Sequence, residues 1–156
     1  MLANASDPFH KLFLENILTS SRPLGFDIRP IMVRGAEESD AGFAEMEQWR
    51  AEALVVQPSL PHKRSADEAI KRRLPAFAPH ADFSAAGGLM SYSADQAAVY
   101  RESAGFVDKI IKGRKPTDLP VQLPTKFLFV VNLKTAAALG LTLPTTLLTR
   151  AYQVIE

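Results

Sequence analysis

Apolar residues near the start of the chain recur at the spacing of an amphipathic helix. The pattern predicts a helix over residues 8–21 that begins at the Asp7–Pro8 pair. Patterns of the same kind predict further helices over 40–50, 63–73, 94–112 and 134–139. In the 63–73 segment, basic and acidic residues alternate at helical spacing, which predicts a solvated helix face.

Short apolar runs lie between the predicted helices. They occur at 26–33, 53–56, 74–77, 87–92 and 127–131, and the proline-containing segment 113–126 is expected to be extended. Runs of this length and composition are typical of strands that are buried on both faces of a parallel sheet. Because they alternate with helices, the sequence predicts an α/β fold with a doubly wound, mostly parallel sheet.

Composition narrows the class of protein further. The chain has 156 residues, 47% of them hydrophobic and 22% charged, which is typical of one globular domain with its own core. A formal net charge of +1 gives no basic field for nucleic acid, and the absence of cysteine excludes disulfides and thiolate chemistry. The first residues contain neither the basic nor the apolar part of a signal peptide, so the chain as given is expected in the cytoplasm.

Candidate groups for catalysis or cofactor binding are sparse. The sequence has no glycine-rich phosphate motif and no nucleophile elbow, and its three histidines are far apart, so we expect no cofactor and no metal. Asp7, Asp82 and Asp95 lie near predicted strand-to-helix corners, where helix capping explains Asp7 and Asp95. No nucleophile has a base beside it, so we expect a binding protein and no enzyme.

A ligand site is expected where the parallel strands end, because open α/β sheets bind ligands outside the carboxyl ends of their strands. The turn Asn4–Asp7 would be such an end if a strand preceded residue 1, and three further ends are Gln57–Ser59, Ala78–His80 and Ser91–Ser93. These segments offer amide, hydroxyl and aromatic groups to a small polar solute. The predicted ligand-binding residues are Asn4, Ser6, Asp7, Gln57, Ser59, Ser91 and Tyr92.

A longer string of motifs runs through the second half of the chain. It comprises Gly87–Tyr92, Phe106–Gly113 with Pro116, Leu119–Val121, Pro124–Phe127 and Val131–Pro144. With these motifs the sequence resembles the ABC transporter substrate-binding proteins related to the tryptophan- and tyrosine-binding group. The resemblance extends from about Asn4 to Glu156.

The resemblance implies a type I periplasmic-binding fold, in which two α/β lobes close over a solute and deliver it to a membrane permease. It implies that this chain is the C-terminal lobe alone, without the partner lobe and without the first strand of its own lobe. Residues 1–92 would then be a partial lobe, 93–113 a helix that packs on the absent lobe, and 114–156 a return segment with the last strand and a C-terminal helix. A periplasmic location and an amino acid or other small organic solute follow from the family alone.

Helix 94–112 has an apolar face that the absent lobe would otherwise cover. An uncovered face of this kind, together with an unpaired strand edge, predicts a homodimer or larger assembly through this helix. Two alternatives to the transport function remain open. One is a stand-alone α/β regulatory or ligand-binding module, and the other is a small hydrolase that uses Asp7, Asp82 and Asp95.

Overall fold

The computed structural model describes residues 1–156, apart from the side chain of Ala36. Its strands are β1 (Leu2–Asn4), β2 (Ile31–Val33), β3 (Leu54–Val55), β4 (Ala76–Ala78), β5 (Met90–Ala94), β6 (Phe127–Asn132) and β7 (Gln153–Ile155). Its α-helices are α1 (His10–Ser21), α2 (Ala36–Gln48), α3 (His62–Lys71), α4 (Ala81–Ala85), α5 (Gln96–Ile111), α6 (Leu133–Ala138) and α7 (Thr145–Leu148). Short 3-10 helices occupy Arg22–Leu24 and Pro116–Asp118.

The strands form one sheet in the order β2-β1-β3-β4-β5-β6-β7. Strands β1 and β2 pair in parallel, and β3 to β7 form a five-stranded run. A parallel bridge between Leu2 and Val56 joins the two parts, and the Gln57 N–H donates to the Leu2 carbonyl at 3.0 Å. Only the β5–β6 pair is antiparallel, so the predicted α/β fold with a mostly parallel sheet is confirmed.

Strand β1 corrects one sequence expectation. The first strand of the lobe was expected to be absent, but Leu2–Asn4 forms it, and it lies between β2 and β3. Three residues are too few for a periodic pattern, which is why the strand escaped prediction. Leu2 and Ala3 are fully buried, as a strand in the middle of a parallel sheet requires.

Other differences concern short elements. The predicted strand over 26–33 is regular only over Ile31–Val33, and helix α4 and the last strand, β7, were not predicted. The last strand was expected at 127–131, but β7 pairs in parallel with β6 beyond it. The ion pairs of α3 join Lys63 to Asp67 and Lys71 to Glu68; Lys63, Asp67 and Lys71 are solvated as predicted, whereas the Glu68 side chain is only 12% exposed.

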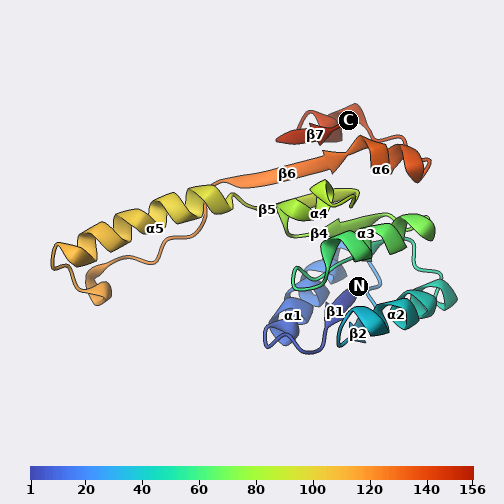
Figure 1. Cartoon of the computed structure of the whole chain (residues 1–156), viewed down its shortest axis with the longest axis horizontal. Helices are drawn as coiled ribbons and strands as arrows, with labels where there is room; N and C mark the ends of the chain where they lie inside the picture. Colours follow the sequence, from blue (N-terminus) through green and yellow to red (C-terminus); the bar gives the residue numbers. More distant parts are fainter.

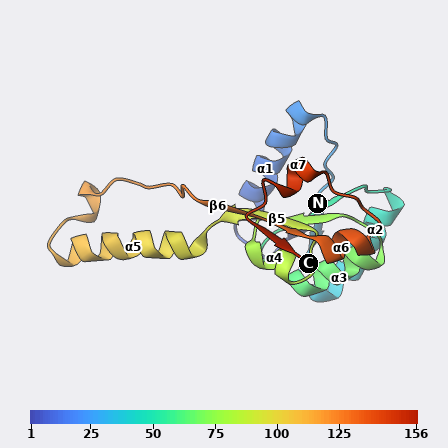
Figure 2. The same cartoon turned by 90° about the horizontal axis from the view of Figure 1, so that it is seen from above.

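Helices cover both faces of the sheet. Figure 2 shows α3, α4 and α6 on one face, and α1 and α7 on the other. The core lies between the sheet and the first of these layers, and its largest fully buried side chains include Phe43, Met46 and Phe83. Burial of each such side chain contributes about 1.5–3 kcal/mol to the free energy of folding.

Helix α5 and the segment that follows it project away from this body. Figures 1 and 2 show α5 extending from the end of β5, with residues 113–126 returning beside it to the start of β6. No residue of α5 is buried. Helix α5 confirms the helix predicted over 94–112. Its N-cap is Asp95, where Ser93 was expected, because β5 continues to Ala94.

Candidate functional site

The site follows from the strand order. Strand β1 leads through α1 to β2 on one side, whereas β3 leads through α3 to β4 on the other side. The chain therefore changes direction between β1 and β3, and a crevice outside the carboxyl ends of these two strands is the usual ligand site of doubly wound sheets. Residues 4–7 follow β1, and residues 57–59 follow β3.

Hydrogen bonds join the two strand ends. The side-chain oxygen of Gln57 accepts from the Asn4 backbone N–H at 2.8 Å, and its amide nitrogen donates to the Asp7 carboxylate at 2.7 Å. The Asn4 side chain accepts from the Ser6 N–H at 2.9 Å. Gln57 is only 2% exposed, so it acts as a buried brace that holds the β1 turn against the end of β3.

Asp7 is the charged group of this crevice. Its other oxygen accepts from the Phe9 N–H at 2.8 Å, at the entry to α1. The Ser59 hydroxyl, followed by that N–H, holds the pKa of Asp7 below its ordinary value. Asp7 is therefore a carboxylate at neutral pH, and it is partly exposed at the rim.

A hollow of about 370 Å³ lies farther along the same edge, outside the ends of β4 and β5. Its polar lining consists of His80, Asp82, Ser93, Asp95 and Gln96. The Ser93 hydroxyl is buried and has no hydrogen-bond partner among the described residues. A solute group in the hollow could supply that partner.

Asp95 fixes the far end of this hollow. Its carboxylate accepts from the Ala98 N–H at 3.1 Å and pairs with the Lys126 ammonium at 2.8 Å. The hydrogen bond from Lys126 and then that from Ala98 lower the pKa of Asp95, and Asp95 in turn raises the pKa of Lys126. Asp95 therefore ties the start of α5 to the start of β6.

The predicted site residues separate into two groups. Asn4, Ser6, Asp7, Gln57 and Ser59 come together at the β1–β3 crevice, as the strand-end rule predicts. The other two, Ser91 and Tyr92, lie on β5 and do not belong to this network.

Ser91 is fully buried. Its hydroxyl accepts from Ser84 at 2.9 Å, and the Ser84 hydroxyl in turn lies 3.3 Å from the Val130 carbonyl. The side chain of Ser91 therefore serves the contact between α4 and β5 and is closed to the rim. A short polar residue in a strand gives no sequence signal that distinguishes this position from a rim position.

Tyr92 points to the opposite face of β5 and is 49% exposed. Its ring stacks on Phe127 with a centroid distance of 5.4 Å and an angle of 3° between the rings. Phe127 is itself 45% exposed, so the pair presents an accessible aromatic surface beside the start of β6.

His80 and Lys126 are not among the predicted ligand-binding residues. His80 follows β4 and lies 4.9 Å from His62, ring centroid to ring centroid. The same strand-end rule points to His80. In contrast, no sequence pattern identifies Lys126, because its approach to Asp95 depends on the antiparallel return of β6.

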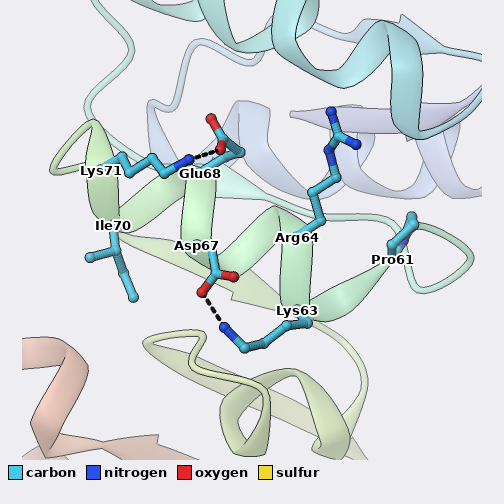
Figure 3. A pocket seen from close by; sticks show the side chains of 7 residues that line it. All are labelled: Pro61, Lys63, Arg64, Asp67, Glu68, Ile70 and Lys71. Atoms are coloured by element: carbon cyan, nitrogen blue, oxygen red, sulfur yellow. Dashed lines mark hydrogen bonds and ion pairs between the residues drawn. The ribbon is translucent and has the colours of Figure 1, made fainter.

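A second hollow, of about 640 Å³, lies along α3 (Figure 3). Its charged lining residues are Lys63, Arg64, Asp67, Glu68 and Lys71, and the figure shows Lys63 paired with Asp67 and Lys71 with Glu68. Arg64 pairs with Asp40 at 3.3 Å, so each of these charged side chains has a partner of opposite charge, and we place the site at the strand ends.

The rim offers several groups that can bind a small polar molecule. It combines a carboxylate, amides, hydroxyls and an imidazole, all of which can hydrogen-bond a small polar molecule. Within the described part of the chain, no cluster of three His, Asp or Glu residues could hold a metal ion. Among the same residues, no helix is long and apolar enough to cross a membrane.

The strand order and the polar crevice together define one lobe of a doubly wound α/β binding protein. The chain belongs to the family of ABC transporter substrate binding proteins, whose model matches residues 37–155. The matched region includes Gln57, Ser59 and the β4–β5 hollow, but not the β1 turn. A comparison with curated protein sequences gives no match.

Solved structures share the fold. A conserved domain protein from Vibrio cholerae superposes with a TM-score of 0.87 at 18% identity, over 98% of this chain and 53% of its own. An ABC domain from Streptococcus pneumoniae in complex with L-Trp gives a TM-score of 0.83 at 23% identity, over 99% of this chain and 55% of its own.

A third structure, a ligand-free, open substrate binding protein with adhesive properties from Clostridium difficile, gives a TM-score of 0.75 at 17% identity, over 99% of this chain and 52% of its own. The chain thus spans about half the length of these structures.

Proposed function

We propose that this chain binds a small polar organic solute, such as an amino acid, at the carboxyl ends of β1, β3, β4 and β5. In this proposal it acts as the solute-binding lobe of an ABC uptake system. The observation that carries the proposal is the hydrogen-bond network in which Gln57 holds Asn4 and Asp7 at the change of direction of the sheet.

The chemistry of the rim favours an amino acid. The Asp7 carboxylate offers a negative partner to a solute ammonium group, and the unpartnered Ser93 hydroxyl offers a further polar contact. Strands β3 and β5 are two strands apart, about 10 Å. A solute with the length of an amino acid can therefore reach from Asp7 and Gln57, which meet at the end of β3, toward Ser93 on β5.

The proposal extends to what happens to the solute. A membrane permease is the partner that a lobe of this family would serve, and a periplasmic location follows from the same reasoning. The Ser59 hydroxyl lies beside the Asp7 carboxylate, but the lowered pKa of Asp7 makes this carboxylate a weak base, so the solute would be released unchanged. A solute held by one lobe also makes few hydrogen bonds, each worth about 0.5–1.5 kcal/mol, so we expect weak binding.

A titration followed by amide NMR tests the proposal. L-Trp added at millimolar concentration to the labelled chain should shift the amide signals of residues 4–7, 57–59 and 93–96. Asp7→Asn should weaken this binding several-fold, because it removes the charge that a solute ammonium would contact. Asp118→Asn is the matched control, since it makes the same change on the projecting segment, and it should leave the binding unaltered.

Two results would count against the proposal. One is the absence of any amide shift with L-Trp and with a panel of other amino acids and small carboxylates. The other is a set of shifts confined to helices away from the strand ends, such as the outer face of α3.

A further inference from the structure

Two of the three histidines meet at the carboxyl edge of the sheet. His62 is the first residue of α3, and His80 lies between β4 and α4. Strands β3 and β4 are neighbours, and α3 and α4 lie side by side on one face of the sheet (Figure 2). The two imidazole rings are therefore 4.9 Å apart, centroid to centroid. The expectation of no metal rested on the separation of the histidines along the chain, and the fold removes that separation for this pair.

The hydrogen bond of His62 determines which of its ring nitrogens is free. Nε2 of His62 lies 3.0 Å from the carbonyl oxygen of Pro58. A carbonyl oxygen can only accept, so Nε2 carries the hydrogen and Nδ1 keeps its lone pair. A backbone carbonyl is a usual partner of a metal-binding histidine, because it fixes the tautomer and the orientation of the ring.

His80 has a carboxylate in the corresponding position. Its Nδ1 is 3.8 Å from a carboxylate oxygen of Asp82. The Asp82 backbone N–H approaches the same nitrogen at 3.4 Å, which is long for a hydrogen bond. A metal ion on Nε2 selects the tautomer with its hydrogen on Nδ1, and the Asp82 carboxylate can accept that hydrogen after a small rotation. His80 can thus present Nε2 as a ligand, with Asp82 behind the ring.

The spacing of the two rings suits a shared ion. An imidazole nitrogen binds Zn²⁺ at about 2.0–2.1 Å, which places the ion about 3.2 Å from the ring centroid. Two rings on one tetrahedral ion are then about 5.2 Å apart, centroid to centroid. The observed separation is 4.9 Å, and an angle of 46° between the rings shows that they are not stacked. Rotation of the two side chains is therefore enough for them to share an ion.

The surroundings restrict both rings. His62 and His80 are half-buried, and the ring of His62 meets the fully buried ring of Phe83 edge-on at a centroid distance of 6.0 Å. Side chains that are already held in place lose less conformational freedom when they bind a ligand. His80 also lines the β4–β5 hollow, so an ion on this pair would lie beside that hollow.

We propose that His62 and His80 form a binding site for a divalent transition-metal ion of the kind that imidazole prefers, such as Zn²⁺. The ligand atoms are Nδ1 of His62 and Nε2 of His80. No cluster of three His, Asp or Glu side chains occurs in the described part of the chain, so water fills the other positions of the ion. The inference does not depend on the proposed solute function, because neither Asp7 nor Ser93 takes part.

A zinc titration by isothermal calorimetry tests the site. The parent chain should bind one Zn²⁺ near neutral pH. His62→Ala and His80→Ala should each raise the dissociation constant at least about tenfold, because each removes one of two ligands. The double variant should bind little more weakly than either single variant, since the two rings act as a unit.

His10→Ala is the matched control, because it removes the third imidazole of the chain. His10 begins α1, on the other face of the sheet from α3 (Figure 2), so this variant should leave the dissociation constant within about twofold. Circular dichroism establishes that every variant folds.

A second measurement needs no variant. In ¹⁵N spectra of the imidazole rings of the parent chain, Zn²⁺ should shift Nδ1 of His62 and Nε2 of His80 and leave the His10 signals in place. A parent chain that binds no Zn²⁺, binding that persists without both His62 and His80, or an equal loss in His10→Ala would overturn the inference. Ring signals of His62 and His80 that do not respond to Zn²⁺ would overturn it as well, whether or not the variants fold.

Discussion

Gly88 lies against the ring of Phe83 in the core. Phe83 is fully buried, and its ring lies where a side chain at residue 88 would have to be. A Cβ atom placed on Gly88 would lie 2.1 Å from the ring, closer than any two carbon atoms can pack. The glycine therefore permits α4 to lie against the start of β5, and β5 carries one end of the rim.

Gly88→Ala should therefore destabilise the fold. The ring would have to leave its position in a filled core, and overpacking of this kind costs about 1–3 kcal/mol in the free energy of unfolding. Urea denaturation followed by circular dichroism measures the change. Gly105→Ala provides the control, because a Cβ atom there meets open space within α5. We expect this control to be neutral or more stable by up to about 1 kcal/mol, and an equal loss in both variants would refute the explanation.

Asp95 connects three elements at one point. Besides capping α5 and pairing with Lys126, its backbone N–H donates to the Lys126 carbonyl at 2.9 Å, beside the antiparallel β5–β6 pair. The departing and the returning segments of the projecting part are thus joined where they meet the sheet. The carboxylate form of Asp95 is the form that makes these contacts.

The pKa shifts of this pair predict how stability depends on pH. Because the pKa of Asp95 is lowered in the folded chain, its contribution is present above the ordinary value of 3.8 and is lost as the pH falls through the lowered value. Asp95→Asn retains a capping side chain but loses the charge pair. The difference in unfolding free energy between parent and variant should be constant near neutral pH and should shrink below about pH 4. A difference that does not change with pH would show that the ion pair contributes nothing.

The sequence predicted long elements and missed short ones for a physical reason. Residues 127–131 are an uninterrupted apolar run and residues 94–112 are long enough to show a helical period, and both elements form. Strands β1 and β7 have three residues each, and they form because neighbouring strands pair with them. Pairing of this kind is a tertiary effect that no local pattern contains.

The candidate site was predictable to the extent that it follows from topology. The rule that ligands bind outside the carboxyl ends of parallel strands selected Asp7 and Gln57, and the fold brings them within hydrogen-bond distance. The rule does not tell which side chain of a strand faces the core, so Ser91 was selected although it is buried. The rule also does not select Lys126, because Lys126 directly precedes β6, which runs antiparallel to β5.

At the scale of the whole molecule, the polar rim and the projecting segment lie in different parts of the structure. The β2-β1-β3-β4-β5 part of the sheet presents the polar rim, and β6 and β7 extend the sheet on the side of the projection. Figure 1 shows α5 directed away from α1, α2 and α3, which surround the first strands.

The most direct test of the central claim is a crystal structure of this chain grown with a saturating amino acid, beginning with L-Trp. The account predicts electron density for the solute outside the carboxyl ends of β1, β3, β4 and β5, with a polar group of the solute within hydrogen-bond distance of Asp7 or Ser93. Solute bound only elsewhere on the chain, with the β1–β3 crevice and the β4–β5 hollow unchanged, would contradict it.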